Sequence, residues 1–211
     1  MNSKTAIRHP ELVAIDGSDG KIYFGGRTEW FPSPAQRQLR GGAVVAAEVL
    51  SYLAATRSNL WALYPPGTRR TQADFEKLMA RVWDFLIPEG REQLTLSNFV
   101  DGVTAYTNFA GHPLVFNVLD IPADRSKRPS ADRCQGFIDD AMDRDAPVAF
   151  LNRSYGEREG EVICNWSLIV SQVGNRVILA DDGVQRPVDF RLWHDTTSLG
   201  GALVFVIRDL L

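Results

Sequence analysis

The order of apolar and polar positions predicts helices in the first two thirds of the chain. Residues 41–55 are apolar on nearly every face, which is typical of a helix that is buried on all sides. Apolar residues at helical spacing predict amphipathic helices at about 71–86, with Thr71 as the N-cap, and at 95–109. A shorter helix is predicted at about 130–144.

The last third of the chain has the pattern of β-strands. Two β-prone runs around a Gly/Asp turn also predict an early hairpin at 12–24. Further strands are predicted at 114–121, 147–152, 162–173, 176–182, 187–193 and 201–207. Helices followed by a strand meander indicate an α+β fold. We expect one domain over residues 1–211, with a helical lobe at about 25–145 and a β lobe at about 146–211.

Composition excludes several classes of protein. The chain has 211 residues, a size that suits one globular domain, and a formal charge of −3, which disfavours binding to nucleic acid. No apolar run approaches the roughly 20 residues that span a bilayer, and the first residues lack the apolar core of a signal peptide. Cys134 and Cys164 are the only cysteines, which is typical of a reducing compartment. We therefore expect a cytoplasmic protein without a membrane or nucleic-acid partner, and its oligomeric state stays open.

The familiar chemical motifs are absent. The sequence has no phosphate-binding glycine loop, no Walker motif, no HExxH, no CxxC and no GxSxG. His9, His112 and His194 have no metal-ligand spacing, so neither a metal nor a cofactor is expected. The acidic residues of 139–145 are interpreted as a solvated helix face. Asp181 and Asp182 with Asp195 remain a weaker candidate for a cation site, because carboxylate oxygens suit Mg²⁺ or Ca²⁺.

The start of the buried helix is the most informative segment. Gly41 and Gly42 leave backbone N–H groups open, and a helix N-terminus can hold an oxyanion or lower the pKa of a thiol. The segment GGAVVAAEVLSYLA (41–54) resembles the nucleophile helix of papain-like cysteine peptidases of the C39-like group, Cys-Gly-Pro-x-Ala-Ala-Ala-Asn-x-Leu-x-Tyr-Leu. Matching backwards from the Tyr-Leu pair puts the nucleophile position at Gly41, or at Gly42 after a slip of one residue.

Later segments extend this resemblance over most of residues 20–207. In the stretch CNWSLIV, Asn165 stands where the family has its catalytic His in His-Trp-x-x-Ile, and Asp181 follows it by sixteen residues, about the family's His-to-Asp spacing. Residues 25–31 and 189–206 are also similar to segments of stand-alone bacterial members. The resemblance implies a papain-like two-lobed domain in which helices surround a buried central helix and an antiparallel sheet follows.

The residues at the matched positions remove the chemistry that the family performs. Glycine carries no nucleophile, asparagine cannot act as a general base, and Asp181 has no imidazole to orient. The resemblance therefore predicts a catalytically degenerate relative that binds a peptide or protein in a vestigial cleft. Trp30, Trp166 and Trp193 are the candidate aromatic walls of that cleft, and the open N–H groups at 41–42 predict a bound carboxylate or carbonyl.

Two other functions stay open. Chemistry could have moved to Cys134 or Cys164 with His112 or His194, or to an acidic site such as Asp181 with its neighbour, although buried and inert thiols are favoured. Cys164 is expected to point away from the cleft, because neighbours on a strand face opposite ways. Alternatively, the chain is an assembly protein that associates through an unpaired edge of the apolar strand 201–207. The matched residues also have structural explanations, as a tight helix start and a turn after a strand.

Overall fold

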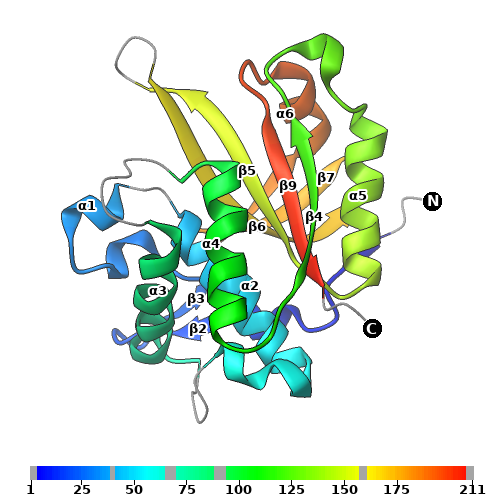
Figure 1. Cartoon of the computed structure of the whole chain (residues 1–211). Coiled ribbons are helices and arrows are strands. Elements are labelled where there is room, and N and C mark those ends of the chain that lie inside the picture. Colours follow the sequence, from blue (N-terminus) through cyan, green and yellow to red (C-terminus); the bar gives the residue numbers. More distant parts are fainter. Residues whose placement is uncertain (1–3, 39–40, 65–69, 88–93, 157–160, 208–211) are drawn as a thin grey trace.

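The computed structural model describes residues 4–38, 41–64, 70–87, 94–156 and 161–207. Helices and an antiparallel sheet make up the described chain, which confirms the α+β class. In Figure 1, helices α3 and α4 lie to the left of the sheet and α5 lies to its right. No described helix is both long enough and apolar enough to cross a bilayer.

The described strands form one seven-stranded sheet and one small hairpin. The large sheet has the order β4-β9-β5-β6-β7-β8, and β1 pairs with β6 outside this path. Every strand pair is antiparallel. The strands are β1 (Lys4–Ala6), β2 (Ala14–Asp16), β3 (Ile22–Phe24), β4 (Val115–Ile121), β5 (Val148–Tyr155), β6 (Val162–Val173), β7 (Arg176–Asp181), β8 (Val184–Asp189) and β9 (Gly201–Ile207).

The order of the sheet corrects one expectation. Strand β9 lies between β4 and β5 and pairs with both, so the apolar segment 201–207 is an interior strand. It presents no unpaired edge to a second copy of the chain, which removes the basis for the predicted assembly through this strand. The predicted hairpin at 12–24 is confirmed, because β2 and β3 pair antiparallel.

The predicted helices are confirmed with small shifts at their ends. Thr71, Thr95 and Ser130 each accept a hydrogen bond from a backbone N–H of the first turn that follows, as N-caps do. The helices are α1 (Pro34–Arg37), α2 (Gly42–Thr56), α3 (Gln72–Leu86), α4 (Leu96–Phe109), α5 (Ala131–Asp143) and α6 (Phe190–Thr196). Short 3-10 turns are η1 (Pro10–Val13), η2 (Thr28–Trp30), η3 (Ser58–Leu63) and η4 (Arg125–Lys127).

Helix α2 is the central element of the core, as its sequence predicts. Its first twelve residues, from Gly42 to Leu53, are all buried. It packs against α3, against the η3 turn and against the inner strands β5 and β6. Glu48 is the one charged residue of this buried stretch, and burying a carboxyl group is unfavourable unless the site stabilises it.

The predicted strand 187–193 is wrong in its second half. Strand β8 ends at Asp189, whose side chain accepts a hydrogen bond from the Leu192 N–H and caps α6. The apolar residues of 190–193 therefore pack as one helical turn, with Phe190 fully buried and Trp193 half-buried against Phe150. A capping Asp followed by four residues of mixed polarity fits a short helix as well as a strand.

The structure differs from the sequence-based expectation at two further points, the lobe boundary and the acidic segment 139–145. Strand β4 and helix α5 precede residue 146, yet β4 pairs with β9 and α5 packs on β6 and β9, so the predicted lobe boundary does not follow the sheet. The acidic segment 139–145 is also not wholly solvated. Asp145 is buried and accepts hydrogen bonds from the Tyr52 hydroxyl and the Arg8 N–H, and Asp139 accepts one from the Thr5 hydroxyl.

Candidate functional site

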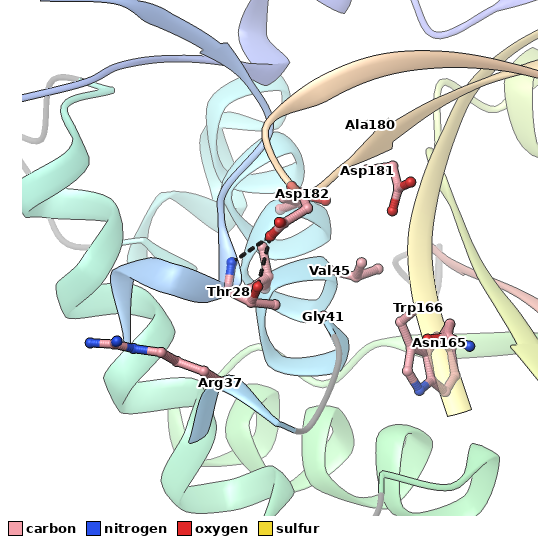
Figure 2. Close-up of a pocket in the computed structure, with 11 residues that line it drawn as sticks. Thr28, Arg37, Gly41, Val45, Asn165, Trp166, Ala180, Asp181 and Asp182 are labelled. Carbon is pink, nitrogen blue, oxygen red and sulfur yellow. Dashed lines mark hydrogen bonds between the residues drawn. The ribbon is translucent and has the colours of Figure 1, made fainter. Parts of the chain in front are cut away.

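A pocket of about 210 Å³ lies where the start of α2 faces the ends of β6 and β7. Figure 2 shows the side chains that line it, which come from segments far apart in the sequence. It is lined by Thr28, Arg37, Gly41, Val44, Val45, Glu48, Asn165, Trp166, Ala180, Asp181 and Asp182. The three positions matched to the family's Cys, His and Asp, namely Gly41, Asn165 and Asp181, thus line one cavity, although 140 residues separate the first from the last.

Gly41 is the N-cap of α2, and both its conformation and its surroundings require glycine. Its φ of 86° lies in the left-handed region that side chains disfavour. A Cβ placed there would lie 2.7 Å from the backbone oxygen of Trp166. A cysteine at position 41 would therefore need the backbone to move. Gly42 is also enclosed, because a Cβ there would collide with the Leu94 side chain, and it does not line the pocket.

Strand β6 contributes Asn165 and Trp166 as neighbours. The amide of Asn165 donates a hydrogen bond to the Ser154 hydroxyl at 3.2 Å, which fixes its orientation on the strand. The indole N–H of Trp166 donates to the Leu94 backbone oxygen at 2.9 Å, and the ring stacks on Phe99 with centroids 4.2 Å apart. These contacts hold the pocket wall opposite Gly41 in one position. They leave no basic group at the place where the family has its imidazole.

The end of β7 contributes two carboxylates with different partners. Asp181 accepts a hydrogen bond from the Nε of Arg186 at 2.8 Å, and burial nevertheless raises the pKa of Asp181 because it outweighs this ion pair. Asp182 instead accepts hydrogen bonds from the backbone N–H of Thr28 at 2.7 Å and from its hydroxyl at 2.8 Å. Figure 2 shows this pair of bonds, which ties the loop after β3 to the β7–β8 turn.

Glu48 is the functional candidate that the sequence analysis missed. Its Oε1 accepts a hydrogen bond from the Gly26 N–H at 2.7 Å, while its buried Oε2 has no hydrogen-bond partner among the described residues. Gly25 takes a φ of 88° beside it and lacks the Cβ that would collide with the carboxyl group. Burial raises the pKa of Glu48 to about 8. The hydrogen bond from Gly26 opposes this rise, and the nearby charges of Asp181 and Asp182 add to it.

The signal for Glu48 was present in the sequence. It is a charged residue in a helix that is otherwise apolar on every face, which calls for a buried partner or a function. In the papain-like pattern, Glu48 stands at the position of an asparagine. Thr28 and Arg37 gave no comparable signal, because each lies in a short helix of mixed polarity, and Asp182 was considered only as an acidic neighbour of Asp181.

Two of the predicted aromatic walls lie elsewhere. Trp30 packs edge-on against Tyr23 and Phe75 and does not line the pocket. Trp193 donates its indole N–H to the Asn152 side chain of β5 at 2.9 Å, and it also lies outside the pocket. Trp166 is therefore the only one of the three candidates that the pocket uses.

Neither thiol is placed for catalysis. Cys134 is completely buried in α5, and burial raises the pKa of its thiol to about 11. Cys164 is buried on β6 next to Asn165 but does not line the pocket, and burial raises its pKa too. A raised pKa keeps a thiol protonated and unreactive near neutral pH. The relocated thiol chemistry considered from the sequence therefore gains no support.

The acidic cation site considered from the sequence is not assembled. Asp195 lies on α6 with its carboxylate against His194, away from the pocket-lining carboxylates. Among the described residues, no group of three or more His, Cys, Asp or Glu side chains is arranged to hold a metal ion. The chemistry available in the pocket is instead acid–base and hydrogen-bonding chemistry from carboxyl groups.

Comparison of the sequence with models of known protein families and with curated proteins gave no match. The function is therefore inferred from the geometry of the pocket and from the resemblance between the segments that line it and the papain-like pattern. In the described part of the chain, the pocket combines three carboxyl groups, the apolar side chains of Val44 and Val45, and no cysteine. Such a site can bind and orient a group, but it cannot perform thiol catalysis.

Proposed function

We propose that this chain is a non-catalytic relative of papain-like cysteine peptidases that binds a peptide segment at the pocket before α2. One observation carries the proposal. Gly41, Asn165 and Asp181 were matched to the family's catalytic positions by sequence spacing alone, and they line a single pocket. The meeting of three positions from three different elements in one pocket supports the arrangement that the resemblance implies.

The residues at those positions support binding in place of hydrolysis. Position 41 has a backbone conformation and a contact with Trp166 that exclude a cysteine side chain without rearrangement. Asn165 has no group that titrates near neutral pH and could accept a proton from a nucleophile. The pocket walls are nevertheless held in place by the hydrogen bond from Trp166 to Leu94 and by the two hydrogen bonds from Thr28 to Asp182.

The dimensions of the pocket suit one side chain of an extended peptide. A volume of about 210 Å³ is below the roughly 300–1,000 Å³ of sites that enclose a whole small molecule. A peptide that inserts one residue here would have the rest of its length outside the pocket, beside the elements that line it. We therefore expect recognition of a short motif with one dominant anchor residue.

The test measures binding and hydrolysis on the same protein. The full chain is applied to an array of immobilised random-sequence peptides, and retained sequences are then titrated in solution. We expect a recurrent anchor residue in the retained peptides. We also expect that Asn165→Trp, which fills the pocket, lowers the affinity at least tenfold. The control Gln185→Trp introduces the same tryptophan side chain at an exposed position of β8 and should leave binding unchanged.

Hydrolysis provides the opposite test. Incubation of the retained peptides with wild-type protein should give no cleavage product by mass spectrometry over a day. Cleavage that disappears in Asp181→Asn would overturn the proposal, because it would show a working catalytic site in this pocket. Retention of no peptide above background would overturn it as well. If Asn165→Trp does not fold by circular dichroism, Asp181→Asn takes its place in the binding assay.

A further inference from the structure

We propose that the anchor recognised by the pocket is a cation, an ammonium or guanidinium group of the bound peptide that lies between the carboxyl groups of Glu48 and Asp181. This inference rests on the proposed function and names its ligand class. An unpaired buried oxygen, the charges around the pocket and the positions of the nearby arginines support it.

The unpaired oxygen is the first observation. Glu48 is 6% exposed and lines the pocket, and its Oε2 has no hydrogen-bond partner among the described residues. A buried carboxyl oxygen without a partner is unfavourable, and native structures seldom keep one without a reason. A guest that donates a hydrogen bond would satisfy this oxygen. Ammonium and guanidinium groups carry several donors and no acceptor, and their hydrogen bonds to carboxylates are among the strongest in proteins.

The charges around the pocket favour the same class of guest. Three carboxyl groups line it, from Glu48, Asp181 and Asp182, and Arg37 is the only cationic residue in the lining. The guanidinium of Arg37 is engaged with the backbone oxygens of Phe31 and Pro32, and Figure 2 shows its side chain extending away from Asp181. Asp181 and Asp182 alone already outnumber the one cation of the lining, and a cationic guest would also favour the charged form of Glu48.

The nearby arginines of other elements do not supply this cation. Arg186 of β8 is largely exposed and reaches Asp181 through a single nitrogen. Arg27, next to Gly26, pairs with Glu29 at 2.7 Å and lies over the ring of Tyr23. The carboxyl group of Glu48 is left without a cationic partner on the part of the chain that the structure describes.

This inference replaces the guest expected from the helix start. The open N–H groups at Gly41 and Gly42 predicted a carboxylate or carbonyl there, but the Trp166 carbonyl oxygen already lies against Gly41. A carboxylate guest would also meet the carboxylates of Asp181 and Asp182 in the same cavity. Carboxylates that share one partly buried cavity repel each other strongly.

Binding of a cation has a consequence for the proton of Glu48. The groups that face it are Asp181 and Asp182 at the end of β7, the Gly26 N–H from the loop after β3, and the apolar side chains of α2. Because its pKa is about 8, most of the free protein carries a proton on Glu48 at pH 7. A cationic guest favours the carboxylate, so the proton passes to the solvent as the ion pair forms.

The test uses four pools of acetylated and amidated pentapeptides. The central residue is Lys, Arg, norleucine or Glu, and the other four positions are equimolar mixtures. Each pool is titrated into ¹⁵N-labelled full chain and followed by NMR. We expect the Lys or Arg pool to shift the amides of Asn165 and Asp181 and to bind at least tenfold more tightly than the norleucine pool, with the Glu pool weakest.

Two variants distinguish binding of the cation in the pocket from general attraction to the negative charge of the protein. Asp181→Asn should weaken the Lys or Arg pool at least fivefold. Asp132→Asn removes a carboxylate with a similar ion pair, to Arg191 at 2.9 Å, on the surface of α5, and should change the affinity by less than twofold. Calorimetry at pH 7 in buffers with different heats of protonation measures the proton release. For wild-type protein the heat of binding should change from buffer to buffer, because the buffer takes up the released proton. For Glu48→Gln it should be the same in every buffer.

The outcomes distinguish this inference from the function on which it rests. Equal binding of all four pools at the pocket, or tightest binding of the Glu pool, would overturn the cation and leave peptide binding intact. Binding of no pool would overturn the proposed function. The cation is then judged with n-butylammonium and n-butylguanidinium chloride alone. Changes in the NMR signals of pocket residues only, which are lost in Asp181→Asn, would support the binding of a cation. No change in these signals would overturn it.

Discussion

Gly41 lies so close to the carbonyl oxygen of Trp166 that a Cβ at position 41 would be 2.7 Å from it. The N-cap residue of the buried helix and the strand that faces it thus approach each other closely through their backbones. The contact is possible because Gly41 has no side chain and a φ of 86°. The packing of the pocket therefore requires a residue without a side chain at position 41.

The first prediction concerns the free energy of unfolding of variants with a substitution at this contact. Gly41→Ala should lower the free energy of unfolding by about 3 kcal/mol, because it combines a disfavoured φ with an overlap against backbone. Gly111→Ala is the matched control, since Gly111 also has a positive φ, of 76°, but has open space around its Cβ position. It should cost about 1 kcal/mol. Urea unfolding of both variants measures the difference, and equal losses would contradict the close contact.

The same contact predicts the result of an attempt to restore catalysis. The double variant Gly41→Cys with Asn165→His supplies both missing groups. We expect it to be destabilised like Gly41→Ala and to hydrolyse no peptide, because the cysteine cannot take the required backbone conformation without displacing Trp166. A fluorogenic peptide pool measures this. Turnover comparable to that of an active cysteine peptidase would show that the backbone at position 41 adapts readily.

Much of the fold could be predicted because its signals are local. The apolar helix α2, the N-cap at Thr71 and the hairpin at 12–24 each depend on a few neighbouring residues, and each is confirmed. The segment 187–193 was predicted wrongly because a helix of seven residues is too short for its periodicity to differ from that of a strand. The interior position of β9 was missed, since strand order depends on long-range pairing that no local pattern encodes.

The candidate site divides in the same way. Gly41, Asn165 and Asp181 could be placed together because a family pattern connects distant segments. Glu48 could not be assigned to the pocket from the sequence, because which face of α2 meets the β7 end is settled only by tertiary packing. Trp30 and Trp193 were wrongly placed at the cleft for a related reason. Large aromatic residues serve cores and clefts equally well, and both of these lie in core clusters.

The second prediction concerns stability against pH. The pKa of Glu48 rises from 4.5 to about 8 on folding, so between these values the folded chain keeps a proton that the unfolded chain has lost. The free energy of unfolding therefore falls as the pH rises through this window, by at most about 1.4 kcal/mol per pH unit from this group. Glu48→Gln should remove that slope and be more stable than wild-type protein at pH 7 and above.

The control for this prediction is Glu11→Gln. Glu11 is exposed, and hydrogen bonds from its own backbone N–H and from His9 lower its pKa below 4.5. Its contribution to stability is present above pH 4.5 and is lost as the pH falls further, so the variant should leave the slope between about pH 4.5 and about pH 8 unchanged. Urea unfolding at intervals of one pH unit measures both. A slope in Glu48→Gln equal to that of wild-type protein would refute the buried neutral carboxyl.

The third prediction concerns the wall of the pocket. Trp166→Phe removes the donor to the Leu94 carbonyl and leaves a buried acceptor without a partner. This should lower the free energy of unfolding by about 1–3 kcal/mol and broaden the NMR signals of Asn165 and Gly41. Trp61→Phe changes a tryptophan that is 55% exposed and should have little effect. If both variants unfold at the wild-type urea concentration, the hydrogen bond does not support the wall.

The fourth prediction concerns the two thiols. Cys134 and Cys164 are buried with raised pKa values, so both should react with iodoacetamide more slowly in the folded chain than in urea at pH 8. Cys134 should react more slowly than Cys164, because it is 0% exposed while Cys164 is 9% exposed. Mass spectrometry of the modified peptides gives both rates. Faster reaction of either thiol in the folded state would revive a role for it in catalysis.

The interior position of β9 also bears on how the chain acquires its structure. In the described part of the chain, β4 pairs only with β9, and β9 is made about eighty residues after β4. During synthesis β4 therefore has no strand partner until residues 201–207 are made. The edge of β5 that pairs with β9 is also unpaired during this time. Nascent chains are therefore exposed to aggregation while the roughly eighty residues between β4 and β9 are added, and we expect chaperone binding to concentrate on segment 115–121.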